Sequence, residues 1–391
     1  MRMNIPEKIL FVSQEYDANG SSISLLSLIK GMDEVKNRHI EITVLIPLKF
    51  KGIKQARDLF LANGIKVREM LYRTNYKKVG MKTPLIRRIH DIWNYLAVKK
   101  LCKYVKKSKF DLICSNSSAV DVGARAALLS HVQHIYYVRE FMEEDHGFEY
   151  RNKKRMRRLL ESSDYTIFIS KAIEEKYKSL YKLQNTAQFY DGFIVNDYII
   201  NDHNILNNTE IRLIQLGSLC DGKGSLNSVR LINELRRVGI ENVHLDFVGN
   251  GVDGYKGKMY ELIKKNKLEK YITILPYSSD IKQKLCIADI LLMNSRSEGF
   301  GRVTIEGMLA GCLVVGRKAA GTAEIIQNDV NGLLYSDESE FVCCIKKILN
   351  NREKYKEVAK YAQNRAVKEF SCEKAAQNFM NVLRGYNESK T

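Results

Sequence analysis

Glu298 and Glu306 lie eight positions apart in the C-terminal half of the chain, on either side of a glycine-rich turn. The apolar run 290–293 before them predicts a buried strand, and the run 303–309 predicts the first turns of a helix. Glu298 would then lie in the loop, and Glu306 about two helical turns further on. N–H groups at a helix start can bind an anion or a polar ligand, and carboxylates accept hydrogen bonds from vicinal hydroxyls. The pattern therefore favours a sugar or a ribose as the ligand.

A second candidate loop of the same half joins the predicted strand 211–217 to a helix that begins near Gly224. Gly217 and Ser218 open this loop, and Lys223 closes it. Backbone N–H groups together with one ammonium could hold a diphosphate here. The alternative is that Lys223 is an ordinary surface lysine.

The N-terminal half has a glycine turn of its own, because Gly20, Ser21 and Ser22 follow the predicted strand 8–13. Glycine lets a ligand approach the main chain closely, whereas the alternative is that a serine simply caps the next helix. The spacing differs from the G-x-G-x-x-G pattern of dinucleotide-binding proteins, which argues against a nicotinamide-dependent enzyme.

The elements that would position these residues alternate between strands and helices. Strands are predicted at 8–13, 40–46, 111–115, 134–138, 165–169, 211–217, 245–249, 271–275 and 290–293, and helices begin near residues 20, 84, 118, 224 and 303. This alternation predicts an α/β architecture with parallel sheets and helices on both faces. A chain of 391 residues suits two domains, and the boundary between them is predicted between residues 191–193 and Glu210, a span that includes the polar, asparagine-rich segment 201–209.

Composition places the chain among globular proteins, since 45% of the residues are hydrophobic and 28% are charged. The eight cysteines form no C-x-x-C pair, so we expect free thiols in a reducing cytoplasm. No apolar run approaches the roughly 20 residues that a membrane-spanning helix needs. The N-terminus leads within a few residues into a strand, so no signal peptide is expected.

The formal net charge is +18, and much of the excess lies in the N-terminal half. One cluster comprises Lys99, Lys100, Lys103, Lys106, Lys107 and Lys109, and another comprises Arg151, Lys153, Lys154, Arg155, Arg157 and Arg158. Such charge can form a solvated face, can attach the protein to anionic lipid, or can bind nucleic acid. No recognisable nucleic-acid-binding motif accompanies it, so nucleic acid is not an expected partner.

The stretch from Glu298 to Glu306 resembles the E-x7-E motif of family 4 of the retaining, nucleotide-sugar-dependent glycosyltransferases, which have the GT-B fold. Three further blocks match the family in the right order: AGCLVV at 310–315, GTAEII at 321–326 and NGLL at 331–334. Leu313 stands where proline is common in the family. The resemblance covers residues 205–370 most clearly.

The resemblance implies a GT-B fold, with two Rossmann-like domains whose parallel sheets face each other across a cleft. The N-terminal domain, residues 1–198, would bind the acceptor. The C-terminal domain, residues 205–371, would bind a nucleotide sugar. The last helix, in residues 372–391, would pack back on the N-terminal domain.

By the same resemblance, Glu298 contacts hydroxyls of the transferred sugar, Glu306 holds the ribose, and Lys223 meets the leaving phosphate. Glu298 and Lys223 are therefore catalytic candidates. The remaining donor-binding candidates are Gly217, Ser218, Asn250, Tyr277, Gly299, Phe300, Gly301, Arg302 and Val303. Ser218 stands where the family usually has an arginine, which removes one positive charge from the expected phosphate site.

On the acceptor side, the resemblance implies that Gly20 and Ser21 face the donor diphosphate and the acceptor. Arg139 is the third catalytic candidate, next to Glu140, at the end of a predicted strand. Both are candidates by position only, because the family often has a histidine near this point and this chain has none there. The acidic run 143–145 could serve the acceptor, or it could be a solvated loop.

The resemblance predicts a hexosyltransferase-type enzyme that moves a sugar from a nucleoside-diphosphate sugar, with uracil as the preferred base. The acceptor would be a glycan or a lipid-linked molecule in bacterial surface polysaccharide synthesis. That setting favours peripheral contact of a cytoplasmic protein with the anionic inner membrane face. The chain has no D-x-D motif, so neither a metal nor another cofactor is expected. The alternatives are a GT-B sugar-nucleotide epimerase and a non-catalytic GT-B partner subunit.

Overall fold

The computed structural model describes residues 6–35, 40–48, 55–81, 86–251 and 254–385. The helix start predicted at Pro84 and residues 386–391 of the predicted C-terminal segment lie outside these ranges. The chain divides into two compact units, which are described separately below. Unit 1 comprises residues 1–193 and 372–391, and unit 2 comprises residues 194–371.

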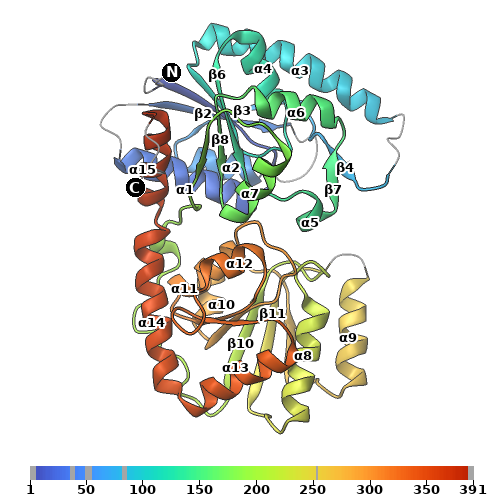
Figure 1. The fold of residues 1–391 in the computed structure, drawn as a ribbon, viewed down its shortest axis with the longest axis vertical. Coiled ribbons are helices and arrows are strands. Elements are labelled where there is room, and N and C mark those ends of the chain that lie inside the picture. Colours follow the sequence, from blue (N-terminus) through green and yellow to red (C-terminus); the bar gives the residue numbers. More distant parts are fainter. Residues whose placement is uncertain (1–5, 36–39, 49–54, 82–85, 252–253, 386–391) are drawn as a thin grey trace. The chain divides into compact units, whose positions relative to one another are not determined.

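Unit 1 is built on a seven-stranded parallel sheet with the order β3-β2-β1-β5-β6-β8-β9. Its strands are β1 (Lys8–Val12), β2 (Glu41–Pro47), β3 (Lys66–Met70), β5 (Leu112–Ser115), β6 (Gln133–Val138), β8 (Tyr165–Phe168) and β9 (Thr186–Gln188). The short strands β4 (Tyr76–Lys78) and β7 (Phe148–Tyr150) pair antiparallel beside it. The central strand β1 is a continuous apolar run because helices cover both faces of the sheet (Figure 1).

The helices of unit 1 include one from the far end of the chain. They are α1 (Gly20–Val35), α2 (Gln55–Ala62), α3 (Ile86–Ser108), α4 (Val122–Ser130), α5 (Glu143–His146), α6 (Lys153–Glu161), α7 (Lys171–Leu180) and α15 (Cys372–Leu383). The C-terminal helix α15 packs against α1. Gly31 permits this approach, because a Cβ there would lie 2.1 Å from the Cys372 carbonyl oxygen.

Unit 2 has a six-stranded parallel sheet with the order β12-β11-β10-β13-β14-β15. Its strands are β10 (Ile211–Leu216), β11 (Val243–Val248), β12 (Ile272–Leu275), β13 (Ile290–Met293), β14 (Leu313–Arg317) and β15 (Leu333–Tyr335). Its helices are the 3-10 turn η1 (Val195–Asp197), α8 (Ser225–Arg237), α9 (Tyr255–Lys265), α10 (Ile281–Leu285), α11 (Arg302–Leu309), α12 (Ala320–Ile325), α13 (Glu338–Asn350) and α14 (Arg352–Glu369).

The predicted α/β class with two Rossmann-like parallel sheets is confirmed. Each strand predicted from the sequence corresponds to a strand of one of these sheets. The helix predicted near residue 118 begins later, at Val122, because residues 116–121 form a buried polar loop.

The boundary between the two units, at residues 193 and 194, falls within the predicted span, and the asparagine-rich segment 201–209 lies inside unit 2. The backbone N–H of Leu206 donates a 2.5 Å hydrogen bond to Asp289 Oδ1. Arg352 donates to the carbonyl oxygens of Leu206, Asn208 and Thr209. These hydrogen bonds fix a segment whose composition alone is typical of a loop.

In the part of the chain that the structure describes, no helix is both long enough and apolar enough to cross a bilayer.

Candidate active site

The topology of unit 2 places the switch point of its sheet at the carboxyl ends of β10 and β13, and we call the junction of the loops that leave these two strands the crevice. After β10 the chain adds β11 and β12 on one side, and then crosses to β13 on the other side of β10. Loops that leave two such strands diverge, and the gap between them is the usual ligand site of an open parallel sheet. Here the two loops are residues 217–224 and 294–301, which contain the glycines, the lysine and the first glutamate selected from the sequence.

Lys223 and Glu298 meet across this crevice. The Lys223 ammonium forms an ion pair with Glu298 Oε1, and Ser295 Oγ donates a 2.7 Å hydrogen bond to the same oxygen. The lysine and glutamate side chains remain 34% and 14% exposed. A ligand that carries both an anionic group and hydroxyls could therefore contact this cation and this carboxylate together.

Two glycines allow the loops at this edge to pack closely. Gly224 has a φ of +67°, and a Cβ on it would lie 2.1 Å from the Asn294 carbonyl oxygen. A Cβ on Gly249, which follows β11, would lie 1.9 Å from the carbonyl oxygen of Gly217. The side chain of Asn294 in turn donates to the Gly224 carbonyl at 3.2 Å and to Ser228 Oγ at 2.9 Å.

Two helices begin at the crevice without a side-chain cap. The residue that precedes α8 is Gly224 and the residue that precedes α11 is Gly301, both in the left-handed conformation, and neither helix start has a side-chain capping bond. The first N–H groups of a helix lack intrahelical partners and carry the positive end of the helix dipole. With Lys223, these two helix starts form a site suited to an anion with more than one phosphate.

Glu306 lies on the second turn of α11 and is the most buried carboxylate of the site. Its side chain is 12% exposed, and Arg302 Nε lies 3.9 Å from Glu306 Oε1. Burial raises the pKa of Glu306, and the charge of Arg302 and a hydrogen bond from Tyr198 only partly offset this effect. Burial also raises the pKa of Tyr198 to about 12. Sequence reasoning missed Tyr198, because it lies in the segment after Phe193 that was assigned to the N-terminal domain.

The other donor-side candidates lie along the same edge of the sheet. Asn250 follows β11 and Tyr277 follows β12, and the Tyr277 N–H donates to Asn250 Oδ1 at 3.4 Å. The Tyr277 side chain is 62% exposed. Ser218 is exposed at the end of β10. The loop of Gly299 and Phe300 is buried against α12, where the Gly321 N–H donates to the Glu298 carbonyl at 2.9 Å. Val303 is half-buried in the first turn of α11.

In unit 1, the corresponding switch point lies between β1 and β5. Gly20 is the first residue of α1, after β1, and Ser21 follows it. Asn116, at the end of β5, donates to Ser21 Oγ at 3.3 Å and accepts from Arg139 Nε at 2.9 Å. The structure therefore brings three of the acceptor-side candidates to one edge of this sheet.

Arg139 is held in a buried ion pair with Asp191. Its Nη1 lies 2.5 Å and 2.6 Å from the two carboxylate oxygens, and the two side chains are 6% and 4% exposed. Ser24 Oγ donates to Asp191 at 2.8 Å, and the guanidinium lies 4.2 Å from the centre of the Tyr137 ring. Arg139 therefore connects Asp191 to Asn116 and helps to position these two side chains. The sequence analysis did not select Asp191, because nothing in the sequence near an acidic loop residue indicates a partner 52 residues away.

Glu140 is also buried, and three donors converge on one of its oxygens. Ser117 Oγ, Ser118 N and Ser118 Oγ lie 2.8, 3.0 and 2.7 Å from Glu140 Oε1. Burial raises the pKa of this carboxyl, while the two serines and Arg139 oppose that shift. The sequence analysis did not select Ser117 and Ser118, because an Asn-Ser-Ser stretch is typical of an ordinary helix cap.

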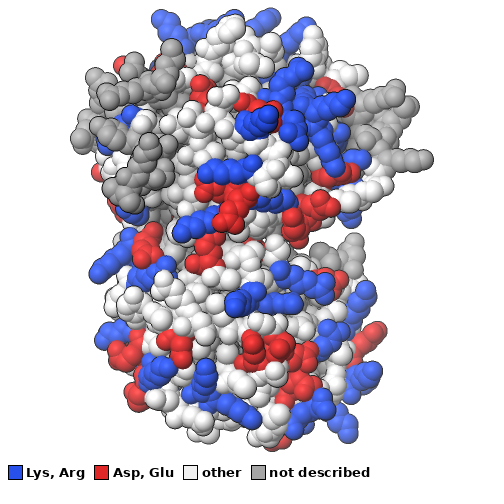
Figure 2. Space-filling view, in the orientation of Figure 1, with Lys and Arg blue, Asp and Glu red and all other residues white. Residues whose placement is uncertain are grey.

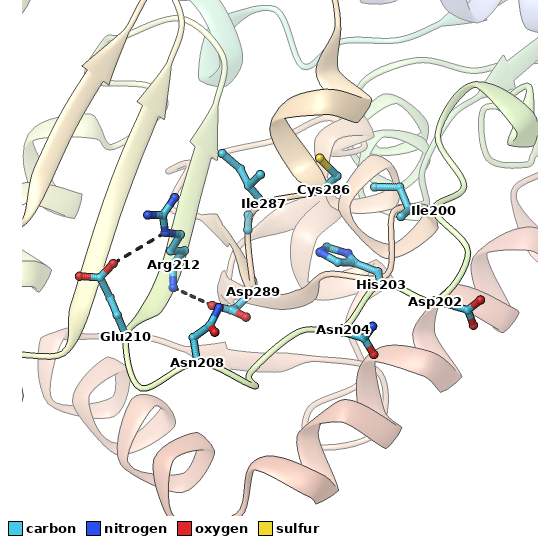
Figure 3. Close-up of a pocket in the computed structure, with 11 residues that line it drawn as sticks. Ile200, Asp202, His203, Asn204, Asn208, Glu210, Arg212, Cys286, Ile287 and Asp289 are labelled. Carbon is cyan, nitrogen blue, oxygen red and sulfur yellow. Dashed lines mark hydrogen bonds and ion pairs between the residues drawn. The ribbon is translucent and has the colours of Figure 1, made fainter.

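A separate cavity of about 560 Å³ lies at the opposite, amino edge of the unit 2 sheet (Figure 3). Its wall includes the ion pair between Glu210 and Arg212, with 3.7 Å between Nε and Oε2. The Arg212 N–H also donates to Asp289 at 2.8 Å. Asp289 and His203 are engaged by main-chain groups, so these two polar side chains are already occupied by the protein itself.

Among the described residues, no three or more His, Cys, Asp or Glu side chains are grouped in a way that could hold a metal ion.

Comparison with known proteins finds similarity to one family over part of the chain. Residues 199–365 match the family model described as glycosyl transferases group 1. An uncharacterized 41.2 kDa protein in the cps region of Klebsiella pneumoniae is 26% identical over 272 residues, which cover 62% of this chain and 69% of that protein. The N-acetyl-alpha-D-glucosaminyl L-malate synthase of Bacillus anthracis is 23% identical over 124 residues, 31% of this chain and 32% of the synthase.

The fold of the whole chain is similar to that of solved structures. The crystal structure of Anabaena Alr3699/HepE in complex with UDP has a TM-score of 0.77 at 21% identity, and the alignment covers 97% of this chain and 100% of that one. The fold is GT-B, with two Rossmann-like domains. The region that matches the family model lies within unit 2.

Proposed function

We propose that the chain is a retaining, metal-independent glycosyltransferase of the family 4 type. It would transfer a hexose from a nucleoside-diphosphate sugar, preferably a UDP-sugar, to a hydroxyl of a glycan or lipid-linked acceptor. The observation that carries this proposal is the contact between Lys223 and Glu298 beside the uncapped starts of α8 and α11. UDP is the favoured nucleotide because the HepE structure, which has the same fold, is described as a complex with UDP.

On the donor side, each charged group has a role that follows from its chemistry. Lys223 and the helix-start N–H groups would hold the diphosphate. Ser218 stands where the family usually has an arginine, so Lys223 would be without the second cation that the family usually supplies there. Glu298 would accept hydrogen bonds from hydroxyls of the transferred sugar. Glu306 would accept hydrogen bonds from the ribose, a role suited to a carboxylate placed beside Arg302 and Tyr198.

The transfer itself would use the leaving group as the base. The acceptor oxygen forms a bond to C1 of the sugar on the face from which the diphosphate leaves, so the anomeric configuration is retained. The bond from C1 to the phosphate oxygen breaks, and that oxygen takes the proton of the acceptor hydroxyl. Lys223 and the N–H dipoles stabilise the negative charge that develops on the phosphate, and Glu298 stabilises the positive charge that develops at C1.

On the acceptor side, unit 1 would present the hydroxyl near the half-buried Ser21 and the buried Asn116 and Glu140. We propose a lipid-linked acceptor and a role in bacterial surface polysaccharide synthesis, at the inner face of the membrane. The Klebsiella relative from a cps region and the net charge of +18 support this setting.

The proposal is tested by ligand-induced thermal shift in the presence of EDTA, with UDP, GDP, ADP and their common sugars. We expect a shift with UDP, because a ligand at a hundredfold excess over its Kd adds about 2.7 kcal/mol to the stability of the folded state. Glu306→Ala should weaken UDP binding about 10- to 100-fold, through the loss of charge-assisted hydrogen bonds. The exposed glutamate Glu261 provides a matched control, Glu261→Ala, which should bind normally. The absence of a shift with every nucleotide would contradict the proposed donor site.

A pH dependence of donor binding is also expected, because the pKa of Glu306 is raised above its usual 4.5. The ionised carboxylate is the better acceptor for ribose hydroxyls, and it is lost when the pH falls through this raised pKa. The affinity for UDP-glucose should therefore weaken on acidification, with a midpoint above 4.5. Isothermal titration calorimetry at a series of pH values from neutral downward would measure the midpoint of this loss of affinity. Glu306→Gln cannot titrate, so a midpoint that persists in this variant would rule out Glu306 as the responsible group.

A further inference from the structure

The outer face of α3 in unit 1 changes from apolar to basic along the helix. Its first half exposes four large side chains at helical spacing: Ile89 is 44%, Ile92 57%, Tyr95 50% and Leu96 48% exposed. Its second half exposes Lys99, Lys100, Lys103, Lys106 and Lys107 on the same side. We call these nine residues the α3 face. The opposite side of the helix carries the buried residues Ala97, Val98, Leu101 and Val105.

Within the described part of unit 1, packing does not explain the apolar half of the α3 face. Residues three and four positions apart on a helix are neighbours on its surface, so Ile89, Ile92 and Leu96 form one stripe. Single exposed apolar residues are common, but a contiguous stripe beside a polar rim marks an interaction surface.

The charge around the stripe is predominantly positive. No aspartate or glutamate occurs in the sequence between Asp91 and Asp111. Helix α6 flanks α3, because Arg155 lies 3.7 Å from Asp91 and 2.8 Å from the buried Asp121 of the loop before α4. The exposed basic residues of α6 are Lys153, Lys154, Arg157 and Arg158. Figure 2 shows Lys and Arg side chains gathered over this part of unit 1.

We propose that the α3 face is a docking surface for an anionic lipid bilayer. Ile89, Ile92, Tyr95 and Leu96 would enter the headgroup region, and the lysines of the second half would lie on the anionic headgroups. A helix with an apolar face and a lysine-rich rim is typical of interfacial membrane attachment, and each lysine near an anionic surface strengthens binding about fivefold. This inference names the surface for the membrane contact of the proposed function and rests on that proposal, but it is independent of the donor.

The direction of α3 also places the apolar half near the acceptor cluster of unit 1. A crossover helix starts at the carboxyl edge of a parallel sheet and runs back to the amino edge. Asn94, in the apolar half, exchanges two 2.8 Å hydrogen bonds with the backbone of Arg73. The nearby Asn75 N–H donates to the Ala119 carbonyl, in the loop after β5, at 2.7 Å. Lipid contacted by the apolar half would therefore lie on the side of the sheet that carries Ser117 and Ser118.

The only tryptophan of the sequence, Trp93, provides a direct probe of this contact. It lies on α3 between Ile92 and Asn94 and is half-buried. We expect vesicles of phosphatidylglycerol and phosphatidylethanolamine to bind the full chain in a flotation assay at moderate salt. Brominated lipid in these vesicles should quench Trp93, and pure phosphatidylcholine vesicles should bind weakly.

Two variants and two matched controls test the two halves of the α3 face. Lys99→Glu/Lys103→Glu/Lys106→Glu should weaken binding at least about 100-fold, because each lysine contributes about fivefold. Ile92→Glu/Leu96→Glu should abolish the quenching. The controls make equal changes on exposed residues of unit 2: Lys258→Glu/Lys264→Glu/Lys265→Glu and Val238→Glu/Val330→Glu. Both controls should bind vesicles like the unchanged protein, and circular dichroism would verify that all four variants are folded.

Several results would overturn the proposal. The first is that both α3 variants bind vesicles as tightly as the unchanged protein. The second is that the unit 2 controls lose as much vesicle binding as the α3 variants. The third is that the unchanged protein binds neutral vesicles as tightly as anionic ones. Tight binding of an RNA oligonucleotide that depends on the three lysines, without vesicle binding, would instead assign the face to nucleic acid. Because the UDP thermal shift needs no membrane, failure of the donor site and failure of the docking surface would be distinguishable.

Discussion

Replacement of Glu298 by alanine is expected to lower kcat/KM for sugar transfer by about 10³-fold while the protein remains folded. A factor of this size corresponds to about 4 kcal/mol of transition-state stabilisation. The reason is electrostatic, since Glu298 is the carboxylate that lies beside Lys223 in the crevice and receives the Ser295 hydrogen bond. Without it, the positive charge that develops at C1 loses the electrostatic support of this carboxylate, and Lys223 loses this ion pair.

The measurement is the rate of sugar transfer from the UDP-sugar identified by thermal shift, with product detected by mass spectrometry. Glu298→Gln keeps the shape and tests the charge alone, so it should lose nearly as much activity as the alanine variant. Glu261→Ala serves as the control for an exposed glutamate of the same unit. Full activity in Glu298→Ala would refute the proposed role. Normal UDP binding with no transfer would separate loss of chemistry from loss of the donor site.

The grouping of the donor-side candidates in unit 2 could be predicted from the sequence because these residues lie in loops directly after apolar strands. Strands such as β10 and β13 are buried on both faces, so each reads as a short apolar run that ends where the loop begins. The polar and glycine residues that follow must then lie at the carboxyl edge. This argument places Gly217, Lys223 and Glu298 together without any knowledge of distances.

The acceptor side could not be predicted to the same extent, because its contacts join residues far apart in the sequence. Asp191 lies in an irregular segment, and only the folded chain brings it to Arg139. On the donor side, Tyr198 was missed for the same reason, because only the folded chain brings it to Glu306. Strands β3, β4, β7, β9, β14 and β15 were also absent from the prediction. β4 and β9 lie beside the main sheet or at its edge and are mostly half-buried, so they lack the apolar pattern of a central strand.

Asp191→Ala is expected to destabilise unit 1 by about 3–5 kcal/mol, which is the usual cost of leaving one charge of a buried pair without its partner. Arg139 would keep its hydrogen bond to Asn116 but would lose both short contacts to the carboxylate. Urea unfolding followed by Trp93 fluorescence would measure the change, because the only tryptophan lies in unit 1. Glu234→Ala removes one partner of an exposed pair in unit 2 and should cost no more than about 0.5 kcal/mol.

The double variant Arg139→Met/Asp191→Leu distinguishes a structural role of this pair from a catalytic one. Replacing both charges by apolar side chains removes the unpaired charge, so much of the stability lost in Asp191→Ala should return. If transfer activity also returns, the ion pair serves only the stability of unit 1. If stability returns and activity does not, the guanidinium itself serves transfer, through its hydrogen bond to Asn116 or through contact with the acceptor. An Asp191→Ala variant as stable as the unchanged protein would contradict the buried ion pair itself.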